Sequence, residues 1–189
     1  MGTVYIIHGC PSSAEKGMDA QTRTYDKHWM PWLKKELMSK GINVEIPLMP
    51  APWEPNYEAY KKEFEKYKVS EEDTLIGHSC GCAFLVRWLG DSGQKVKRLI
   101  LVAPWKIAPQ NDALKRAFYE YPIDESVKSQ VSEVIIFTAD NEAADGKKSV
   151  KLFHNALGGK VIELEGRGHY ILRHMGTEEF PELRDVVLS

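Results

Sequence analysis

The chain has 189 residues, of which 43% are hydrophobic and 28% charged, a composition typical of globular proteins. With 25 Lys and Arg against 27 Asp and Glu, the formal net charge is −2, and no long basic run offers a footprint for nucleic-acid phosphates. No apolar stretch approaches the ~18 residues that cross a bilayer, so we expect no membrane partner. The length predicts a single domain over residues 1–189.

Six segments rich in β-branched and apolar residues alternate with helical patterns along the chain. Most of them are continuous apolar runs, which is typical of strands buried on both faces of a parallel sheet. The predicted strands are Thr3–His8, Ile42–Ile46, Thr74–His78, Arg98–Ala103, Val134–Thr138 and Lys160–Leu164.

Five helices are predicted from apolar side chains at helical spacing. Asn56 is a capping residue for the second, Gly90 is expected to close the third, and Thr177 is expected to start the last. The predicted helices are His28–Lys40, Asn56–Lys68, Cys80–Leu89, Lys147–Leu157 and Thr177–Val187. This alternation predicts an α/β fold, a three-layer α/β/α sandwich with right-handed crossovers.

The pentapeptide Gly77-His78-Ser79-Cys80-Gly81 lies between a predicted strand and a predicted helix. A Gly-x-Ser-x-Gly sequence in this context holds its serine on a strained turn with the hydroxyl exposed. The glycines two residues before and after the serine let strand and helix approach closely. Ser79 is therefore the predicted nucleophile of an acyl-transfer reaction.

A serine hydroxyl needs a neighbouring base, and the base needs an orienting acid. His169 is the predicted base, because it follows the last strand in the glycine-bearing loop 166–169; His174 is a weaker alternative. Asp140 and Glu142 both lie in the loop after the fifth strand, and either carboxylate could orient the histidine. The chain order of serine, acid and histidine is that of α/β-hydrolases.

Two backbone N–H groups are predicted to bind the oxyanion of the reaction. One belongs to Cys80 at the start of the helix after the serine, and the other to Cys10 in the loop after the first strand. This arrangement places the two cysteines near each other beside Ser79, and the favoured interpretation is that both are small apolar fillers. The alternative hypothesis is that oxidation or alkylation there blocks the site.

The number and spacing of the cysteines also predict the redox state of the protein's compartment and whether it binds a metal. Three of them, Cys10, Cys80 and Cys82, are an odd number, and the first residues lack the features of a signal peptide. We therefore expect free thiols in a reducing compartment and a cytoplasmic location. The Cys80-Gly81-Cys82 spacing lacks the two-residue spacer of common zinc sites, so we expect no metal, and no cofactor is required.

The chain resembles the small serine hydrolases of the retinoblastoma-binding-protein-9 and YdeN type, within the α/β-hydrolase superfamily. The resemblance covers nearly the whole chain. It is carried by Val4–Gly9, the segment 28–37 with its tryptophans, Met49-Pro50 with Trp53, Gly77–Gly81, Leu99–Val102, and Gly168-His169-Tyr170.

The resemblance implies a compact α/β-hydrolase with a six-stranded parallel sheet and no large lid. It also implies Ser79 as nucleophile and His169 as base. The family's acid usually precedes a proline, which this chain lacks. An alignment without gaps puts Glu142 on the acid position, and we favour it over Asp140.

We therefore expect a serine hydrolase that cleaves small carboxylic esters, or amides or thioesters, through an acyl-enzyme on Ser79. Its pocket is expected to draw on Trp53, Trp105 and Phe118, which favour partly apolar acyl or aryl groups. The alternative is a protein-binding module on a hydrolase scaffold with weak or no catalysis, although no sequence feature identifies a protein partner.

Overall fold

The central feature of the computed structural model, which describes residues 2–189, is one parallel sheet of six strands. The strand order is β2-β1-β3-β4-β5-β6, and every neighbouring pair is parallel. The strands are β1 (Val4–Ile7), β2 (Val44–Glu45), β3 (Thr74–His78), β4 (Val96–Val102), β5 (Val131–Ala139) and β6 (Lys160–Leu164). All six predicted strands are confirmed: β3 and β6 have the predicted bounds, and the bounds of the other four are shifted.

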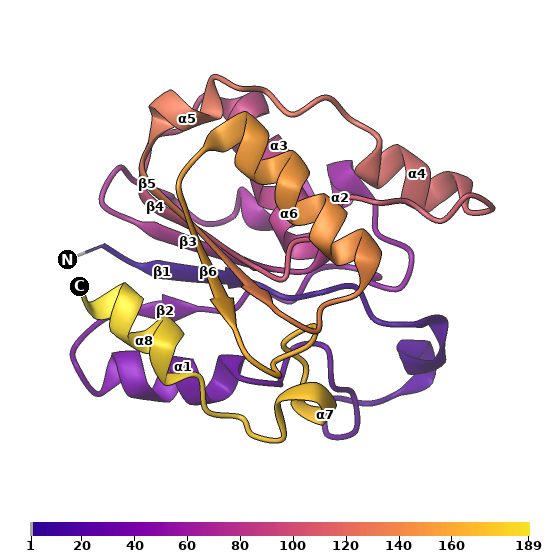
Figure 1. Ribbon diagram of the computed structural model, residues 1–189, viewed down its shortest axis with the longest axis horizontal. Coiled ribbons are helices and arrows are strands. Elements are labelled where there is room, and N and C mark those ends of the chain that lie inside the picture. Colours follow the sequence, from indigo (N-terminus) through magenta and orange to yellow (C-terminus); the bar gives the residue numbers. More distant parts are fainter. Residues whose placement is uncertain (1) are drawn as a thin grey trace.

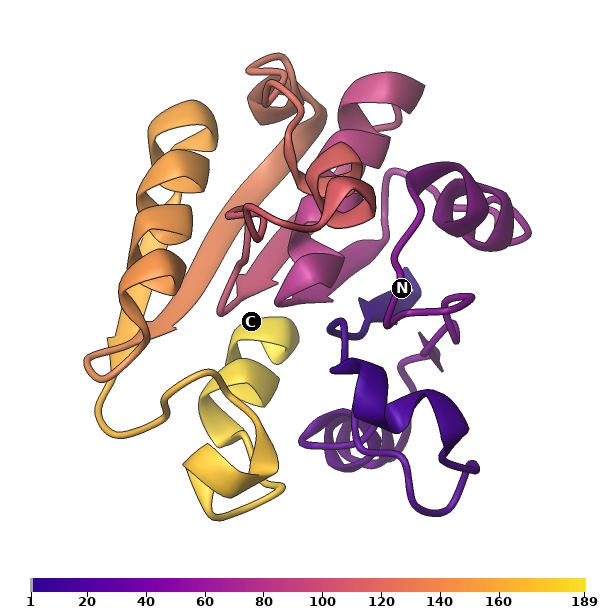
Figure 2. The same ribbon diagram turned by 90° about the vertical axis from the view of Figure 1, so that its right-hand side faces the viewer.

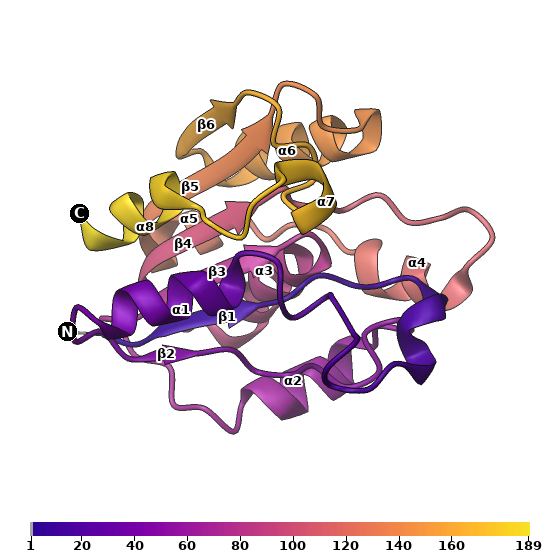
Figure 3. The same ribbon diagram turned by 90° about the horizontal axis from the view of Figure 1, so that it is seen from below.

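Helices cover both faces of the sheet, as the continuous apolar strands predict (Figure 1). On one face lie α2 (Tyr57–Phe64), α3 (Cys80–Ser92), α4 (Ala113–Tyr119), α5 (Val127–Gln130) and α6 (Ala144–Leu157). On the other lie α1 (Met30–Met38) and α8 (Pro181–Leu188), and Figures 2 and 3 show the same separation from the side and from below. The three-layer sandwich is therefore confirmed.

Successive buried side chains of a strand point to opposite faces of the sheet and so pack into two separate halves of the core. In β1, Tyr5 and Ile7 face the α2–α3 layer, whereas Val4 and Ile6 face the α1–α8 layer. All four side chains are buried. Because both faces are covered, the hydrophobic effect fixes the sheet between its layers and holds the carboxyl ends of the strands in place.

Several helix boundaries differ from the predictions, among them the end of α3 and the start of α8. α3 runs through Gly90 and ends at Gly93, whose positive φ of 67° makes it the left-handed cap. α8 begins at Pro181 rather than near Thr177, because proline favours the first helical position; the hydroxyl of Thr177 instead accepts a hydrogen bond from the Glu179 N–H. Asn56 caps α2 as predicted, accepting from the Ala59 N–H at 3.0 Å.

Short segments without a sequence prediction complete the fold. These are η1 (Ser13–Gly17), α4, α5 and α7 (Leu172–Met175). η1 and α7 border the end of the sheet where the strands β1 and β6 finish. Within residues 2–189, no helix has the length and apolar character that a membrane span requires.

Candidate active site

Ser79 lies on a tight turn between β3 and α3, with φ 52° and ψ −117°. A non-glycine residue with positive φ is strained, and such strain is concentrated at functional sites. Two glycines make the turn possible: a Cβ on Gly77 would lie 2.6 Å from the Cys82 nitrogen, and one on Gly81 would lie 2.4 Å from the Ile7 carbonyl oxygen. The predicted nucleophile turn is present.

The side chains of Ser79, His169 and Glu142 form a continuous hydrogen-bonded chain. Oγ of Ser79 lies 2.8 Å from Nε2 of His169, and Nδ1 of His169 lies 2.8 Å from Oε2 of Glu142. A carboxylate can only accept, so Nδ1 carries the imidazole proton and Nε2 is left to accept the serine proton. The arrangement can activate the hydroxyl as a nucleophile.

The two candidate acids have different positions. The Glu142 side chain is 1% exposed, and its other oxygen accepts the Ala143 N–H at 2.7 Å. Asp140 is exposed, and its Oδ1 accepts the N–H groups of Asn141 and Gly166. Asp140 therefore shapes the loop, whereas Glu142 contacts the histidine.

Gly146 gives the Glu142 side chain its room. This residue lies in the first turn of α6, and a Cβ there would come within 2.7 Å of Cγ and Cδ of Glu142. The glycine was not singled out from the sequence, because the packing of Glu142 against α6 is not a local pattern. It is a positioning residue for the carboxylate.

Two other histidines hold the backbone of His169. Its N–H donates to Nδ1 of His174 at 3.0 Å, and its carbonyl oxygen accepts from Nε2 of His78 at 2.9 Å. Burial lowers the pKa of His78 well below its usual value, so this ring is neutral. His174, the weaker candidate base, therefore supports the stronger one.

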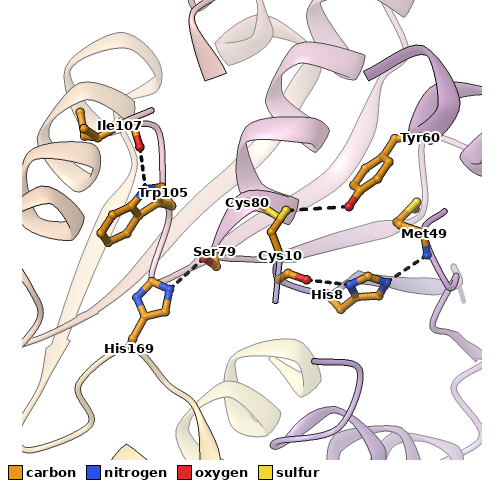
Figure 4. Close-up of a disulfide and its surroundings, with 10 residues drawn as sticks. His8, Cys10, Met49, Tyr60, Ser79, Cys80, Trp105, Ile107 and His169 are labelled. Atoms are coloured by element: carbon orange, nitrogen blue, oxygen red, sulfur yellow. Dashed lines mark hydrogen bonds between the residues drawn. A yellow bond between two sulfur atoms is a disulfide. The ribbon is translucent and has the colours of Figure 1, made fainter. Parts of the chain in front are cut away.

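The loop after β1 brings a second backbone N–H to the nucleophile. The N–H groups of Cys10 and Cys80 donate no hydrogen bond to another group within residues 2–189. Nδ1 of buried His8 donates to the Gly9 carbonyl oxygen at 2.9 Å, and its Nε2 accepts the Met49 N–H at 3.0 Å (Figure 4). Because C=O and N–H point in opposite directions across a trans peptide, this bond also sets the direction of the Cys10 N–H.

Comparison with known proteins identifies the family of this chain. Residues 20–189 match the family described as serine hydrolase. The chain belongs to the serine hydrolase family. It is 26% identical to YdeN of Bacillus subtilis (strain 168), over 98% of this chain and 94% of that protein.

Solved structures share the fold of this serine hydrolase. The ydeN gene product of B. subtilis matches with a TM-score of 0.84 and 22% identity, over 100% of this chain and 97% of that one. Est1E from Butyrivibrio proteoclasticus, solved with ferulic acid bound, matches with a TM-score of 0.67 and 12% identity over 99% and 86%. These similarities support the compact α/β-hydrolase fold.

The expectation of free thiols is wrong for two of the three cysteines of this serine hydrolase. Cys10 and Cys80 form a disulfide with a Cα–Cα distance of 5.7 Å, and buried Cys82 alone stays a thiol. The sequence places Cys10 and Cys80 near each other correctly. An odd number of cysteines does not exclude a disulfide, because two of the three can lie close together in the fold and form a bond.

The cavity at Ser79 has a mostly apolar wall that also includes charged residues of both signs. It measures about 730 Å³ and is bordered by residues of the 9–28 loop, the 169–173 segment and Glu178. Tyr25, His28, Lys27 and Arg173 are among its lining residues. Burial lowers the pKa of His28 to about 4, so this ring stays neutral at pH 7.

The three aromatic residues predicted for the pocket have different locations. Trp105 lines a second cavity of about 560 Å³ beside Glu142 and His169, and its ring meets the His169 ring edge-on at 5.4 Å. Phe118 is wrong as a pocket residue, because it is 2% exposed and packs against Tyr60 in the core. Trp53 is half-buried and lines neither of these two cavities.

Proposed function

We propose that this protein is a carboxylic-ester hydrolase that works through an acyl-enzyme on Ser79. The observation that carries the proposal is the hydrogen-bonded chain from Ser79 Oγ through His169 to Glu142, with both distances 2.8 Å. The membership of the serine hydrolase family supports the same reaction class.

In the first half of the reaction, Ser79 Oγ attacks the ester carbonyl carbon as Nε2 of His169 takes its proton. Glu142 holds the ring orientation and stabilises the imidazolium that forms. The carbonyl oxygen becomes an oxyanion and accepts hydrogen bonds from the N–H groups of Cys10 and Cys80. The helix dipole of α3 adds positive potential at the Cys80 N–H.

In the second half, the imidazolium of His169 donates its proton to the leaving alkoxide, and the alcohol departs. A water molecule then attacks the acyl group on Ser79, with His169 again acting as the base. Collapse of this second tetrahedral intermediate releases the carboxylic acid and restores the serine hydroxyl. Every proton transfer in this cycle uses residues of this chain.

The substrates that fit this proposal are small carboxylic esters. The cavity at Ser79, about 730 Å³, is of the size of small-molecule sites. Its wall is mostly apolar and includes aromatic Tyr25, so an acyl or aryl group suits it. The charged lining residues, which are Glu15, Lys27, Arg173 and Glu178, are of both signs and suit a polar substituent. Amides and thioesters are alternative substrates, because the same three side chains serve all of these reactions.

A fluorophosphonate probe together with nitrophenyl esters tests the proposal. We expect the wild type to be labelled and to hydrolyse short-chain esters, and Ser79→Ala to lose both. Ser12→Ala is the matched control, because Ser12 lines the same cavity. Folded wild type that neither labels nor hydrolyses any ester, amide or thioester overturns the proposal and favours a binding module.

A further inference from the structure

The disulfide joins the two residues whose N–H groups are the proposed oxyanion donors, so this inference rests on the proposed function. Cys10 lies in the loop after β1, and Cys80 is the first residue of α3, 70 positions later. Figure 4 shows the two sulfurs bonded between these elements, beside Ser79. The crosslink therefore ties the two halves of the oxyanion site together.

The backbone around this crosslink is tightly packed. A Cβ on Gly9 would lie 3.3 Å from the Ser79 Cβ, and one on Gly81 would lie 2.9 Å from the His8 carbonyl oxygen. Buried Tyr60 donates its hydroxyl to Sγ of Cys10 at 3.8 Å. A shift of the Cys10 loop therefore moves backbone that touches the nucleophile.

Loss of the crosslink removes the restraint against such a shift. Two thiol sulfurs keep van der Waals contact distance, whereas disulfide sulfurs are covalently bonded, so the Sγ atoms of Cys10 and Cys80 separate when the bond breaks. Cys80 is fully buried in the first turn of a helix, whereas Cys10 is partly exposed in a loop. Without the crosslink, the Cys10 loop and its N–H are therefore the freer of the two segments to move.

We propose that the Cys10–Cys80 disulfide positions the two oxyanion donors, so that the disulfide form turns over substrate quickly and the dithiol form turns over slowly. Preorganised donors stabilise the transition state because they need no rearrangement as charge develops. The sign is opposite to the sequence-based hypothesis that oxidation blocks the site. The disulfide form has the Ser79–His169–Glu142 chain fully assembled.

The switch is a two-electron exchange with a small dithiol. One thiolate of the reductant attacks a protein sulfur and forms a mixed disulfide, releasing the other protein sulfur as a thiolate. The second thiolate of the reductant then closes its own disulfide and releases the remaining protein sulfur. The protein gains two electrons and two protons, which the dithiol loses, and a low-molecular-weight disulfide reverses the exchange.

The test measures kcat and KM of the full chain for a nitrophenyl ester before and after reduction with dithiothreitol. We expect kcat to fall about 10- to 100-fold, which is less than the roughly 100- to 1000-fold cost of removing one donor, because the donors are misplaced and not lost. KM should change little, because the donors act in the transition state. Reoxidation with oxidised glutathione should restore kcat.

Two variants separate this effect from general reduction. Cys10→Ala combined with Cys80→Ala should have the low kcat both with and without dithiothreitol. Cys82→Ala is the matched control: it removes the buried free thiol, keeps the crosslink and should respond as the wild type does.

The results distinguish a failure of the disulfide's positioning role from a failure of the proposed hydrolase function. Equal kcat in the two redox forms, with Ser79 labelled by the fluorophosphonate in both, overturns the positioning role and leaves the proposed function standing. The same holds if reduction lowers only the melting temperature, or if reduction raises kcat. Absence of labelling and hydrolysis in both forms overturns the proposed function, and this inference falls with it.

Discussion

Oε2 of Glu142 lies 2.8 Å from Nδ1 of His169, whereas the carboxylate of Asp140, two residues earlier, accepts only the backbone N–H groups of Asn141 and Gly166. The acid of the proposed reaction is thus a glutamate. The direct contact with His169 distinguishes Glu142 from Asp140.

Glu142→Gln should lower kcat by about 10⁴, because an amide in this place favours the wrong tautomer of His169. Asp140→Asn should retain kcat within a few-fold, since an asparagine oxygen can still accept the N–H groups of Asn141 and Gly166. Ester hydrolysis under saturating substrate measures both. Equal losses in the two variants would contradict the assignment.

Gly146→Ala should lower kcat by about 10- to 100-fold, because the new Cβ would push the Glu142 carboxyl away from His169. The control is Gly17→Ala, where no heavy atom lies within 4 Å of the added Cβ. Steady-state kinetics and thermal melting of both variants provide the measurement. Unchanged turnover in folded Gly146→Ala would show that the carboxyl has another way to reach the ring.

The free energy of unfolding should fall as pH drops from about 6.5 to about 4. Burial lowers the pKa of His8 to about 4, whereas the unfolded value is about 6.5. The unfolded chain therefore binds more protons in this window, so stability rises with pH across it and is lost on acidification. His8 contributes a slope of at most about 1.4 kcal/mol per pH unit.

Urea unfolding of His8→Gln at several pH values isolates this contribution. The glutamine amide can donate and accept as the imidazole does, yet it does not titrate. We expect a shallower pH dependence than in the wild type. Parallel curves for the two proteins would mean that His8 binds protons equally in the native and unfolded states, and so that folding does not lower its pKa.

Reduction of the Cys10–Cys80 disulfide should lower the free energy of unfolding by about 4 kcal/mol. The sequence separation of 70 residues means that the crosslink removes much freedom from the unfolded chain, and the chain-entropy estimate for such a loop gives this value. Denaturant unfolding with and without dithiothreitol measures it. The Cys10→Ala, Cys80→Ala double variant should show no response to the reductant.

The nucleophile and the base could be predicted from the sequence because local patterns carry them. Ser79 is marked by flanking glycines between a strand and a helix, and His169 follows the last strand. Parallel strands bring their carboxyl ends to one edge, so the meeting of these two residues follows from topology. The sheet and its layers could be predicted for the same reason.

The remaining parts depend on packing that no local pattern encodes. Glu142 and Asp140 both carry a carboxylate and lie in the same loop after β5. Only the path of the chain into α6 determines which of the two carboxylates reaches His169. The support of His169 by His174 and His78, and the pairing of Cys10 with Cys80, likewise depend on distances across the fold. Phe118 shows the converse, since an aromatic residue in the connection between two strands can belong wholly to the core.

The wall of the Ser79 cavity and the acid Glu142 come from different segments of the chain. Its wall comes from the long excursion after β1 and from the turns before α8, whereas Glu142 is anchored outside it, where β5 runs into α6. Grafting a different excursion between Cys10 and the first long helix would therefore change much of the recognition surface and spare both the proton-transfer residues and the oxyanion donors. Divergence of substrate preference needs no redesign of the chemistry.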